Sequence, residues 1–291
     1  MARLAISICV AAGCASDPDP AWMAKLPDAT NLAAMSIPGT HDSAARMEPI
    51  PGVAKTQDLD FQEQLDGGVR FFDLRLRNFQ DQFWLYHGGI DQSQTLDDTL
   101  ATLYGFLDAH PTETIIASVK EEEAAYEATL SFEQLFTQYT DMHPEKWSFG
   151  TTVPALGDVR GKIVLLRRFD STTIAGIDGH PAIWTDNATF DIAGDAALHV
   201  EDEYVVTDNS LKWTAITRAF GQATADSDPA TLYLTFTSGY QTVMGLPNIE
   251  SVSDVIDPMI DSYLATAQGR QGIVIMDFVT AARAAAVIAA N

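Results

Sequence analysis

The sequence predicts an α/β fold, a single (β/α)8-type TIM barrel that is irregular or incompletely closed. Short β-branched or aromatic runs of strand length alternate with longer stretches in which apolar residues recur at helical spacing. No internal repeat or linker interrupts the chain after residue 22, so the alternation belongs to one domain at residues 23–291. The eight predicted strands are residues 33–37, 69–74, 83–86, 114–119, 163–166, 198–204, 232–236 and 273–276.

Apolar periodicity predicts helices at three places between these strands. It is carried by Leu96, Leu100, Leu103 and Leu107, then by residues 130–139, and then by residues 255–264. Residues 171–197 are rich in Gly, Asp and Thr, and are predicted to form a loop where the barrel is irregular. A doubly wound open sheet is the alternative, but no Gly-rich nucleotide-binding loop follows the first strand.

The charge of the chain limits its partners. Acidic residues outnumber basic ones by 40 to 17, which gives a net charge of −23. Such a field repels nucleic acid and anionic membrane surfaces, so we expect no nucleic-acid partner and no polybasic docking. An anionic phospholipid would be bound only in a locally basic pocket. We interpret the overall acidity as an adaptation of the source organism to solubility or salt tolerance, rather than as a feature of function.

The N-terminus is typical of a targeting segment. Residues 1–13 form a leader with Arg3 at its start and a short apolar run, and Cys14 follows small residues as in a bacterial lipoprotein. Residues 14–22 are predicted to form a tether. Cys9 and Cys14 are the two cysteines of the chain, so the mature body would contain no disulfide. We expect an exported protein, lipid-anchored at Cys14 or simply secreted; a mis-assigned start codon is the weaker alternative.

Unusual polar residues stand at or just after the predicted strands, and parallel strands of a barrel open onto one face, where such enzymes place their sites. Pro38 and Gly39 are expected to end the first strand and to set His41 at this mouth. The candidates are His41, Asp42, Asp73, Arg75, His87, Lys120, Arg168, Asp202, Tyr204 and Asp277.

Two histidines, an arginine and several carboxylates around one pocket indicate cleavage of a phosphodiester. The attacking hydroxyl needs a base, the leaving oxygen needs an acid, and the charge that grows on phosphorus needs a cation. Histidine can serve as base and as acid near neutral pH. We expect Asp42 and Asp73 to orient Arg75 and His87, although the sequence does not say which carboxylate orients which group.

Eight segments carry a resemblance that covers nearly the whole mature chain. SIPGTHDS at residues 36–43 closely resembles the opening motif of the bacterial phosphatidylinositol-specific phospholipase C family. The other segments similar to this family are GGVRFFDLRLR at 67–77, YHG at 86–88, PTETIIASVK at 111–120, LGDVRGKIVLLRRF at 156–169, residues 184–190, EDEYV at 201–205 and IVIMDFV at 273–279.

The resemblance implies a role for most of the candidates. His41 corresponds to the general base, His87 to the general acid and Arg75 to the essential arginine. Asp277 corresponds to the carboxylate that orients the base. The residues that correspond to the inositol pocket are Lys120, Arg168, Asp202 and Tyr204, the last stacking on the sugar ring.

The resemblance also bears on cofactors. In the calcium-dependent relatives the positions of Arg75 and Lys120 are carboxylate ligands, and two cations in these places would repel calcium and replace its charge. We therefore expect neither a metal nor another cofactor. The acidic run at residues 121–123 is interpreted as the solvated start of a helix.

The resemblance implies a monomeric enzyme that acts at a membrane surface on phosphatidylinositol or a related inositol phospholipid, and yields inositol 1,2-cyclic phosphate and diacylglycerol. The loops at 47–55 and 238–247 lack the rim tryptophans of the family, but Tyr240, Met244 and Leu246 are candidates for that role. One alternative is a phosphodiesterase of the same fold for a glycerophosphodiester or sphingolipid headgroup. Another is a non-catalytic inositol-binding surface protein. No role is assigned to His110, His143, His180 or His199.

Overall fold

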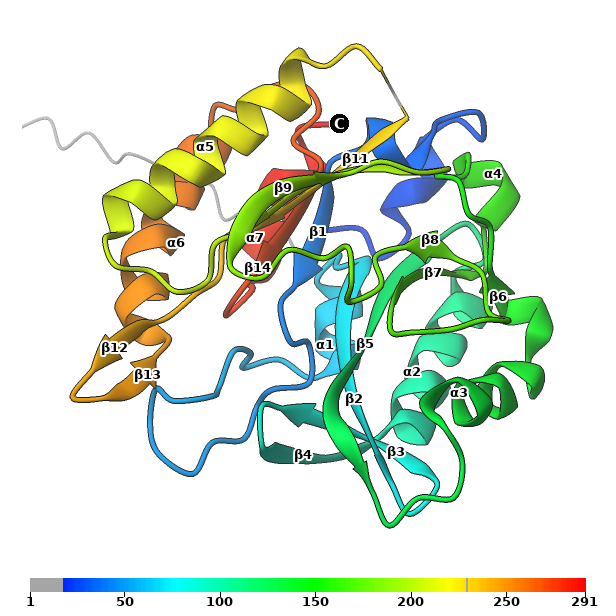
Figure 1. Ribbon diagram of the computed structural model, residues 1–291. Coiled ribbons are helices and arrows are strands. Elements are labelled where there is room, and N and C mark those ends of the chain that lie inside the picture. Colours follow the sequence, from blue (N-terminus) through cyan, green and yellow to red (C-terminus); the bar gives the residue numbers. More distant parts are fainter. Residues whose placement is uncertain (1–17, 229) are drawn as a thin grey trace, which may run out of the picture.

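The computed structural model describes residues 18–228 and 230–291, and most of their strands form one curled sheet covered by helices (Figure 1). The main path of this sheet runs β6-β7-β5-β2-β1-β14-β11-β10-β9. Its strands are β1 (Ile37–Thr40), β2 (Phe71–Phe79), β5 (Ile115–Tyr126), β6 (Trp147–Ser148), β7 (Ile163–Arg168), β9 (Ala188–Ile192), β10 (Ala197–Asp202), β11 (Thr231–Phe236) and β14 (Ile273–Met276).

The sheet is an incompletely closed barrel, as predicted. Every pairing along the path from β6 to β10 is parallel, and β9 is added antiparallel to β10. The short strand β8 (Ile177–Asp178) pairs with β7 at the other end. Within the described residues no pairing joins β9 to β6 or β8, so the barrel has a seam between its ends.

Side chains alternate between the inside of the barrel and the helical layer, because successive residues of a strand face opposite ways. Phe71, Ile116 and Ile275 belong to a buried cluster inside the barrel. Phe72 and Val274 belong to a second cluster that packs against the helices. Continuing the inward alternation toward the carboxyl ends of the strands gives Asp73, Arg75, Ser118, Lys120, Arg168, Asp202 and Asp277.

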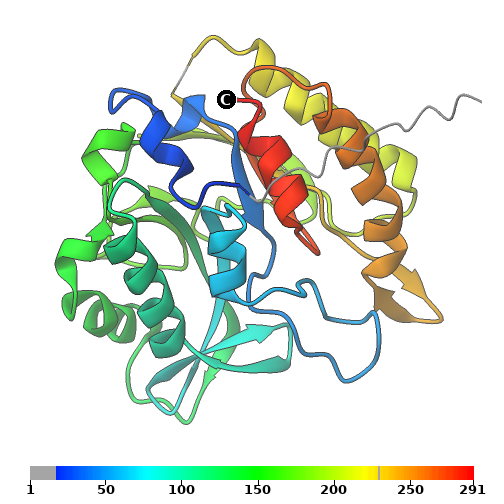
Figure 2. The same ribbon diagram turned by 180° about the vertical axis from the view of Figure 1, so that it is seen from behind.

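Helices cover the outside of the sheet. Figure 1 shows α2 and α3 beside β5 and β7, whereas α5 and α6 lie on the other flank, and Figure 2 shows α7 and α1 from behind. The three predicted helices are confirmed as α2, α3 and α6, whereas α5 was not predicted. The bounds are α1 (Phe61–Asp66), α2 (Leu96–Ala109), α3 (Phe132–Asp141), α4 (Leu156–Val159), α5 (Asn209–Ala225), α6 (Glu250–Leu264) and α7 (Ala281–Ile288), with 3-10 helices η1 (Trp22–Lys25), η2 (Leu32–Ala34) and η3 (Pro144–Lys146).

The prediction for the first strand is wrong, because Pro38 and Gly39 lie inside β1 instead of ending it. Pro38 can take this place because its carbonyl accepts a hydrogen bond from Arg70 N (2.9 Å) and its nitrogen needs no partner. A Cβ atom at Gly39 would lie 2.9 Å from Cδ1 of Phe71, so a larger residue there would collide with the packed interior. Residues expected to begin the strand form η2 instead.

The strand predicted at residues 83–86 exists but is not a barrel strand. It is β3 (Gln82–His87), which pairs antiparallel with β2 and with β4 (Ile90–Thr95). β2 extends beyond the barrel mouth, and β3 returns along it, so that His87 comes back to the mouth. Residues 171–197 are not only a loop, because they contain β8 and β9.

Two smaller features complete the described chain. β12 (Gln241–Val243) and β13 (Leu246–Asn248) form a separate hairpin. Among residues 18–228 and 230–291, no helix is both long and apolar enough to cross a membrane. The predicted leader falls on residues 1–17, outside the described residues. Trp22, at the end of the predicted tether, is buried and donates a hydrogen bond to Gly68 O (3.0 Å).

Candidate active site

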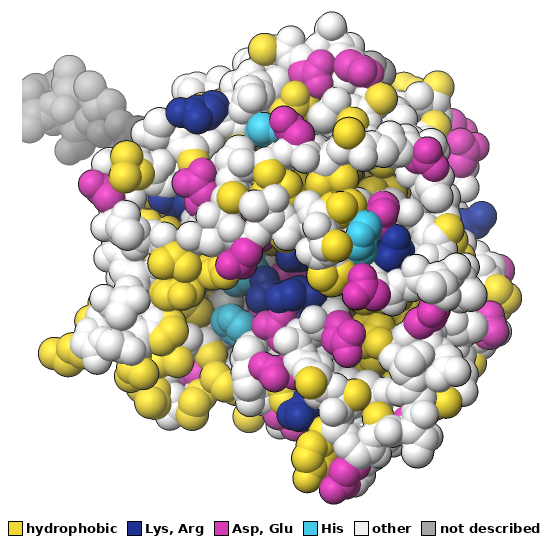
Figure 3. Space-filling view, viewed as in Figure 1, with side chains coloured by type: hydrophobic (Ala, Val, Ile, Leu, Met, Phe, Trp, Pro, Cys, Tyr) yellow, Lys and Arg dark blue, Asp and Glu magenta, His cyan; other side chains and the backbone are white. Residues whose placement is uncertain are grey.

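The mouth of the barrel holds a cavity of about 560 Å³. Basic side chains are visible in this central hollow, with histidine and acidic side chains beside them (Figure 3). Predicted residues that line it are His41, Arg75, His87, Lys120, Arg168, Asp202 and Tyr204. The other three candidates, Asp42, Asp73 and Asp277, are buried. The structure therefore brings all ten predicted residues together at one end of the barrel.

His41 faces the cavity from the residue that follows β1. Its Nδ1 donates a hydrogen bond to Oδ1 of Asp277 (2.8 Å), which follows β14. This contact leaves Nε2 as the free nitrogen of a neutral ring. The edge of the His41 ring also packs against Phe236, with ring centroids 6.2 Å apart. The carboxylate and the aromatic ring together fix the direction of the imidazole.

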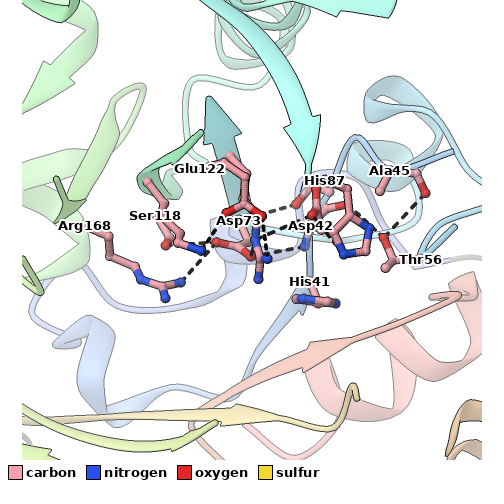
Figure 4. A network of polar contacts seen from close by, with 12 residues as sticks. His41, Asp42, Ala45, Thr56, Asp73, His87, Ser118, Glu122 and Arg168 are labelled. Atoms are coloured by element: carbon pink, nitrogen blue, oxygen red, sulfur yellow. Dashed lines mark hydrogen bonds and ion pairs between the residues drawn. The ribbon is translucent and has the colours of Figure 1, made fainter. Parts of the chain in front are cut away.

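His87 stands across from His41, with ring centroids 6.0 Å apart and ring planes at 86°. Its Nδ1 donates to the carbonyl oxygen of Ala54 (2.6 Å), and its Nε2 lies 3.7 Å from Oδ2 of Asp42 (Figure 4). Burial and the nearby Arg75 guanidinium lower the pKa of His87, although the Ala54 carbonyl partly offsets them. Both histidines thus turn Nδ1 to an anchor and keep Nε2 for chemistry.

Arg75 projects between acidic groups. Its Nε donates to Oδ2 of Asp73 (2.9 Å), and its Nη1 lies 3.4 Å from Oε1 of Glu122. Burial alone would lower the pKa of Arg75, but Asp73, Glu122 and Asp42 outweigh it and raise that pKa. Burial alone would raise the pKa of Asp73, but Arg75 and Arg168 hold it well below its usual range. The guanidinium is therefore permanently charged and rigidly held.

The open question of which carboxylate serves which group has a geometric answer. Asp73 hydrogen-bonds Arg75, whereas Asp42 lies between Arg75 Nε (3.6 Å) and His87 Nε2 (3.7 Å). Asp42 has φ = 40°, a left-handed backbone conformation that aims its side chain into this gap. Burial raises the pKa of Asp42 to about 8, because the attraction of Arg75 only partly opposes it.

Glu122 belongs to the site, and its interpretation as part of a solvated helix start is wrong. It lies in β5, where it faces inward two residues after Lys120. It accepts hydrogen bonds from Lys120 Nζ (2.6 Å) and Gly88 N (3.0 Å). Burial alone would raise the pKa of Glu122, but Arg75 and Lys120 lower it to about 2. Strand alternation beyond Lys120 is the sequence signal that would have identified it.

Trp184 is a second residue of the site without a predicted role of its own. Its ring lies under the Arg168 guanidinium, 3.7 Å from the ring centroid, and its Nε1 donates to Oδ2 of Asp202 (3.0 Å). Arg168 ends β7 and Asp202 ends β10, so the indole spans the seam of the barrel. Nearby, the Tyr204 hydroxyl donates to Oδ1 of Asp186 (2.7 Å) at the cavity rim.

The positive charges of Arg75 and Lys120 at the centre of the site disfavour the binding of a divalent cation there. Arg75 and Lys120 lie on either side of Glu122, as their hydrogen bonds to it require. Within the part of the chain that the structure describes, no group of three or more His, Cys, Asp or Glu side chains is arranged to hold a metal. His180 and His199 pair with Asp178 and Asp191 outside the cavity lining.

Comparison with known proteins agrees with this geometry. The family model described as Phosphatidylinositol-specific phospholipase C, X domain, matches residues 35–169, which contain both His41 and His87. A protein named 1-phosphatidylinositol phosphodiesterase, from Staphylococcus aureus (strain Newman), is 32% identical over 273 residues, covering 88% of this chain and 87% of the relative. This chain belongs to the phosphatidylinositol-specific phospholipase C family. The predicted resemblance is confirmed.

Solved structures of the family share the fold. A phosphatidylinositol-specific phospholipase C from Staphylococcus aureus is similar with a TM-score of 0.85 at 30% identity, covering 94% of this chain and 97% of the other. The corresponding protein from Listeria monocytogenes has a TM-score of 0.77 at 26% identity, covering 94% of this chain and 98% of the other. The likeness therefore extends over the whole barrel of this phospholipase C family member.

Proposed function

We propose that this chain is a metal-independent phospholipase C that cleaves phosphatidylinositol into inositol 1,2-cyclic phosphate and diacylglycerol. The observation that carries the proposal is the pair His41 and His87, 6.0 Å apart across one cavity, with Arg75 beside them. Both rings line the same cavity, so a base and an acid can face one bound phosphodiester. The names of the relatives, which call them 1-phosphatidylinositol phosphodiesterases, support the same substrate.

In this mechanism His41 Nε2 takes the proton from the 2-hydroxyl of the inositol, and the resulting oxygen attacks the neighbouring phosphorus. Asp277 stabilises the imidazolium that forms. Arg75 stabilises the charge that builds up on the non-bridging oxygens. His87 Nε2–H then protonates the diacylglycerol oxygen as its bond to phosphorus breaks. Because the nucleophile belongs to the substrate, high effective molarity supplies much of the rate.

The remaining polar residues of the cavity are proposed to bind the inositol ring. Lys120 and Glu122 offer a donor and an acceptor that already bond each other at 2.6 Å. Arg168 and Asp202 offer a second such pair, linked by the indole of Trp184. Ring hydroxyls both donate and accept, so alternating charged donors and acceptors match an inositol. Tyr204 at the rim is proposed to stack on the ring, as the resemblance implies.

An apolar rim beside the cavity is proposed to contact the membrane. Its hairpin part is formed by Val243, Met244 and Leu246, and Met244 is 101% exposed. Met47 and Ile50 are exposed on the neighbouring loop, whose Gly52 O accepts a hydrogen bond from the amide of Ile249 (2.8 Å), the residue that follows the hairpin. Hydrophobic side chains gather over this end of the molecule (Figure 3). Such side chains can replace the rim tryptophans that the sequence lacks.

The remaining expectations stay proposals. We propose that the protein is exported, that residues 1–13 are its leader and that Cys14 is the point of lipid anchoring. We further propose that residues 23–291 act as one catalytic domain and as a monomer, without nucleic acid. The large excess of acidic over basic residues, 40 to 17, supports the exclusion of nucleic acid.

The decisive experiment incubates the protein with phosphatidylinositol and with phosphatidylcholine in the presence of a chelator. Phosphorus NMR should detect inositol 1,2-cyclic phosphate from the first substrate and no product from the second. His41→Ala should lower the rate by about 10²-fold or more, because the general base is lost. Cleavage of phosphatidylcholine, a product without the cyclic phosphate, or activity that requires added calcium would contradict the proposal.

A further inference from the structure

The loop between β1 and α1 is held together by a carboxylate that the mechanism above does not use. Residues 46–55, here called the rim loop, fold back so that Oε2 of Glu48 accepts from the backbone amides of Lys55 (3.1 Å) and Ala54 (3.3 Å). Gln92 fastens the start of the loop, because its side chain accepts from Met47 N (2.9 Å) and donates to Met47 O (3.2 Å). The loop is therefore an ordered part of the cavity wall.

The electrostatics of Glu48 agree with this geometry. Burial on its own would raise the pKa of the Glu48 carboxyl. Hydrogen bonds from the amides of Lys55, Gly52, Ala54 and Val53 outweigh burial and hold that pKa below its usual value. Near neutral pH the group is thus a carboxylate surrounded by amide donors, and it fixes the direction in which those peptide groups point.

One of these peptide groups reaches the active site. The Lys55 N–H that binds Glu48 and the Ala54 carbonyl that accepts from His87 Nδ1 (2.6 Å) belong to the same peptide unit. A peptide unit is planar, and in its trans form the N–H and the C=O point in opposite directions. A carboxylate that holds the N–H therefore aims the carbonyl at the imidazole. Its charge also polarises the carbonyl as a hydrogen-bond acceptor.

We propose that Glu48 is a positioning residue for the general acid His87, acting through the Ala54–Lys55 peptide group. The inference rests on the proposed function where it names His87 the general acid. The contacts that link Glu48 to His87 do not depend on that function. It gives the two histidines comparable supports: Asp277 holds Nδ1 of His41 directly, and Glu48 holds Nδ1 of His87 through one peptide.

The chemistry of an acid explains why this support matters. When His87 gives up the proton on Nε2, the neutral ring that remains carries its proton on Nδ1. A carbonyl aimed at Nδ1 stabilises that tautomer and keeps Nε2 turned to the cavity. Without it the ring can turn, and the proton is no longer delivered along the line of the breaking bond. The orientation that makes general acid catalysis by His87 effective is then lost.

The groups around His87 define what a change at Glu48 should do to its titration. Asp42 lies 3.7 Å from Nε2, and the His41 ring centroid is 6.0 Å away. Arg75 lowers the pKa of His87, whereas the Ala54 carbonyl, Glu122 and Asp277 raise it. If the Ala54 carbonyl is held less firmly, its hydrogen bond no longer raises the pKa of His87. That pKa should therefore fall.

The test compares two substrates that differ in their need for an acid. Diacylglycerol leaves phosphatidylinositol as an alkoxide that needs protonation, whereas 4-nitrophenol leaves inositol 1-(4-nitrophenyl phosphate) as a stabilised phenolate that does not. Glu48→Ala should lose about tenfold on phosphatidylinositol and no more than about twofold on the aryl substrate, because only the first reaction uses general acid catalysis. Glu48→Gln, which keeps an acceptor oxygen without the charge, should lie between wild type and Glu48→Ala.

Asp58→Asn is the matched control. Asp58 lies just after the rim loop and pairs with the Lys55 side chain (2.5 Å) rather than with the Lys55 amide. The control should leave the ratio of the two activities unchanged, and thermal melting should show that all three variants fold. Equal losses on both substrates, or no loss on phosphatidylinositol, would overturn the proposal, because a merely structural role does not change leaving-group selectivity.

A second measurement is independent of turnover. Nitrogen-15 NMR of the histidine side chains should show that His87 carries its neutral proton on Nδ1 in the wild type. In Glu48→Ala its pKa should be lower and its tautomers mixed. An unchanged pKa and tautomer would refute the role of Glu48 even if the protein cleaves phosphatidylinositol. A wild type that cleaves neither substrate would instead refute the proposed function and leave the NMR result to decide on Glu48.

Discussion

His41 and Asp277 are 236 positions apart in the sequence, yet Nδ1 of one lies 2.8 Å from Oδ1 of the other. The register of the central strands produces this contact. Thr40 pairs with Met276 across β1 and β14, so the next residue of each strand reaches the mouth at the same height. The His41 amide then donates to Met276 O (3.0 Å) and fixes the backbone beside the ring.

This pairing predicts the effect of Asp277→Asn. The amide of the new side chain can donate to Nδ1, which would move the proton of neutral His41 to Nε2 and remove the base. We expect kcat on phosphatidylinositol to fall by about 10³-fold or more, as for other carboxylates that set the tautomer of a catalytic histidine. A melting temperature close to that of the wild type would exclude unfolding. A loss smaller than tenfold would show that the carboxylate does not set the tautomer.

The lowered pKa of His87 predicts how the rate falls as the pH rises. Burial and Arg75 lower that pKa, so the acid loses its proton at a lower pH than an ordinary histidine. The rate constant kcat/KM follows the free enzyme, and should therefore fall as the pH rises through a value below 6.5, the ordinary pKa of histidine. A pH profile with a soluble inositol phosphodiester measures this. A descending limb well above the ordinary value would contradict the assignment of His87 as acid.

The sequence predicts the site better than the strands that carry it. His41, Arg75 and Asp277 lie together at the barrel mouth, where the sequence predicts them, because residue type and motif survive errors in strand bounds. The sequence pattern places the first strand too early. His87 is predicted to follow a barrel strand at residues 83–86, but that strand is an antiparallel excursion that returns along β2 to the mouth. Such an excursion depends on how far β2 extends, which tertiary pairing decides and local pattern does not.

Glu122 is a residue of the site whose burial the local sequence composition does not predict. Three consecutive glutamates are usually solvated, and local composition favours that interpretation. In the folded protein Glu122 has a side-chain exposure of only 7% because Arg75 and Lys120 face it from inside the barrel. The partners that make its burial possible come from β2 and from the same strand two residues earlier. Local composition therefore does not predict the burial of Glu122, and only the alternation of β5 beyond Lys120 indicates that its side chain faces inward.

The lowered pKa of Glu122, which Arg75 and Lys120 cause, predicts how the stability of the fold depends on acid. Its pKa is lowered from 4.5 to about 2, so the folded protein holds the carboxylate in a range where the unfolded chain binds a proton. The stabilisation is complete above the unfolded pKa and is lost as the pH falls from about 4.5 to about 2, which amounts to about 3 kcal/mol at 1.36 kcal/mol per unit. Urea unfolding at pH 5 and pH 2.5 should show this loss in the wild type. Glu122→Gln should show a smaller one, and an equal loss in both would contradict it.

Trp184 predicts a change in substrate binding. Its ring supports Arg168 and its Nε1 supports Asp202, so Trp184→Ala should free both side chains. We expect the KM of a soluble inositol substrate to rise by about tenfold or more, since a cation–π contact and a hydrogen bond to a charged group are lost together. Trp184→Phe keeps a ring under Arg168 and should lose less. A change in kcat with an unchanged KM would mean that the indole acts on the reacting groups instead.

The hairpin at residues 241–248 predicts how the protein meets a membrane. It contains no Lys, Arg, Asp or Glu, and its exposed side chains Val243, Met244 and Leu246 are apolar. Replacing all three by Ser should lower the affinity for phosphatidylcholine vesicles by about tenfold or more, because the apolar area that would enter the bilayer is removed. The rate on a soluble inositol phosphodiester should stay unchanged, since none of the three residues lines the cavity.

Salt separates this apolar contact from an electrostatic one. With a net charge of −23 the protein is repelled by anionic vesicles, and added salt screens that repulsion. Binding to phosphatidylcholine should therefore be insensitive to salt, and binding to vesicles containing an anionic lipid should strengthen as salt is raised. A polybasic surface would behave in the opposite way. If salt released the protein from either vesicle, charge rather than the apolar hairpin would be holding it there.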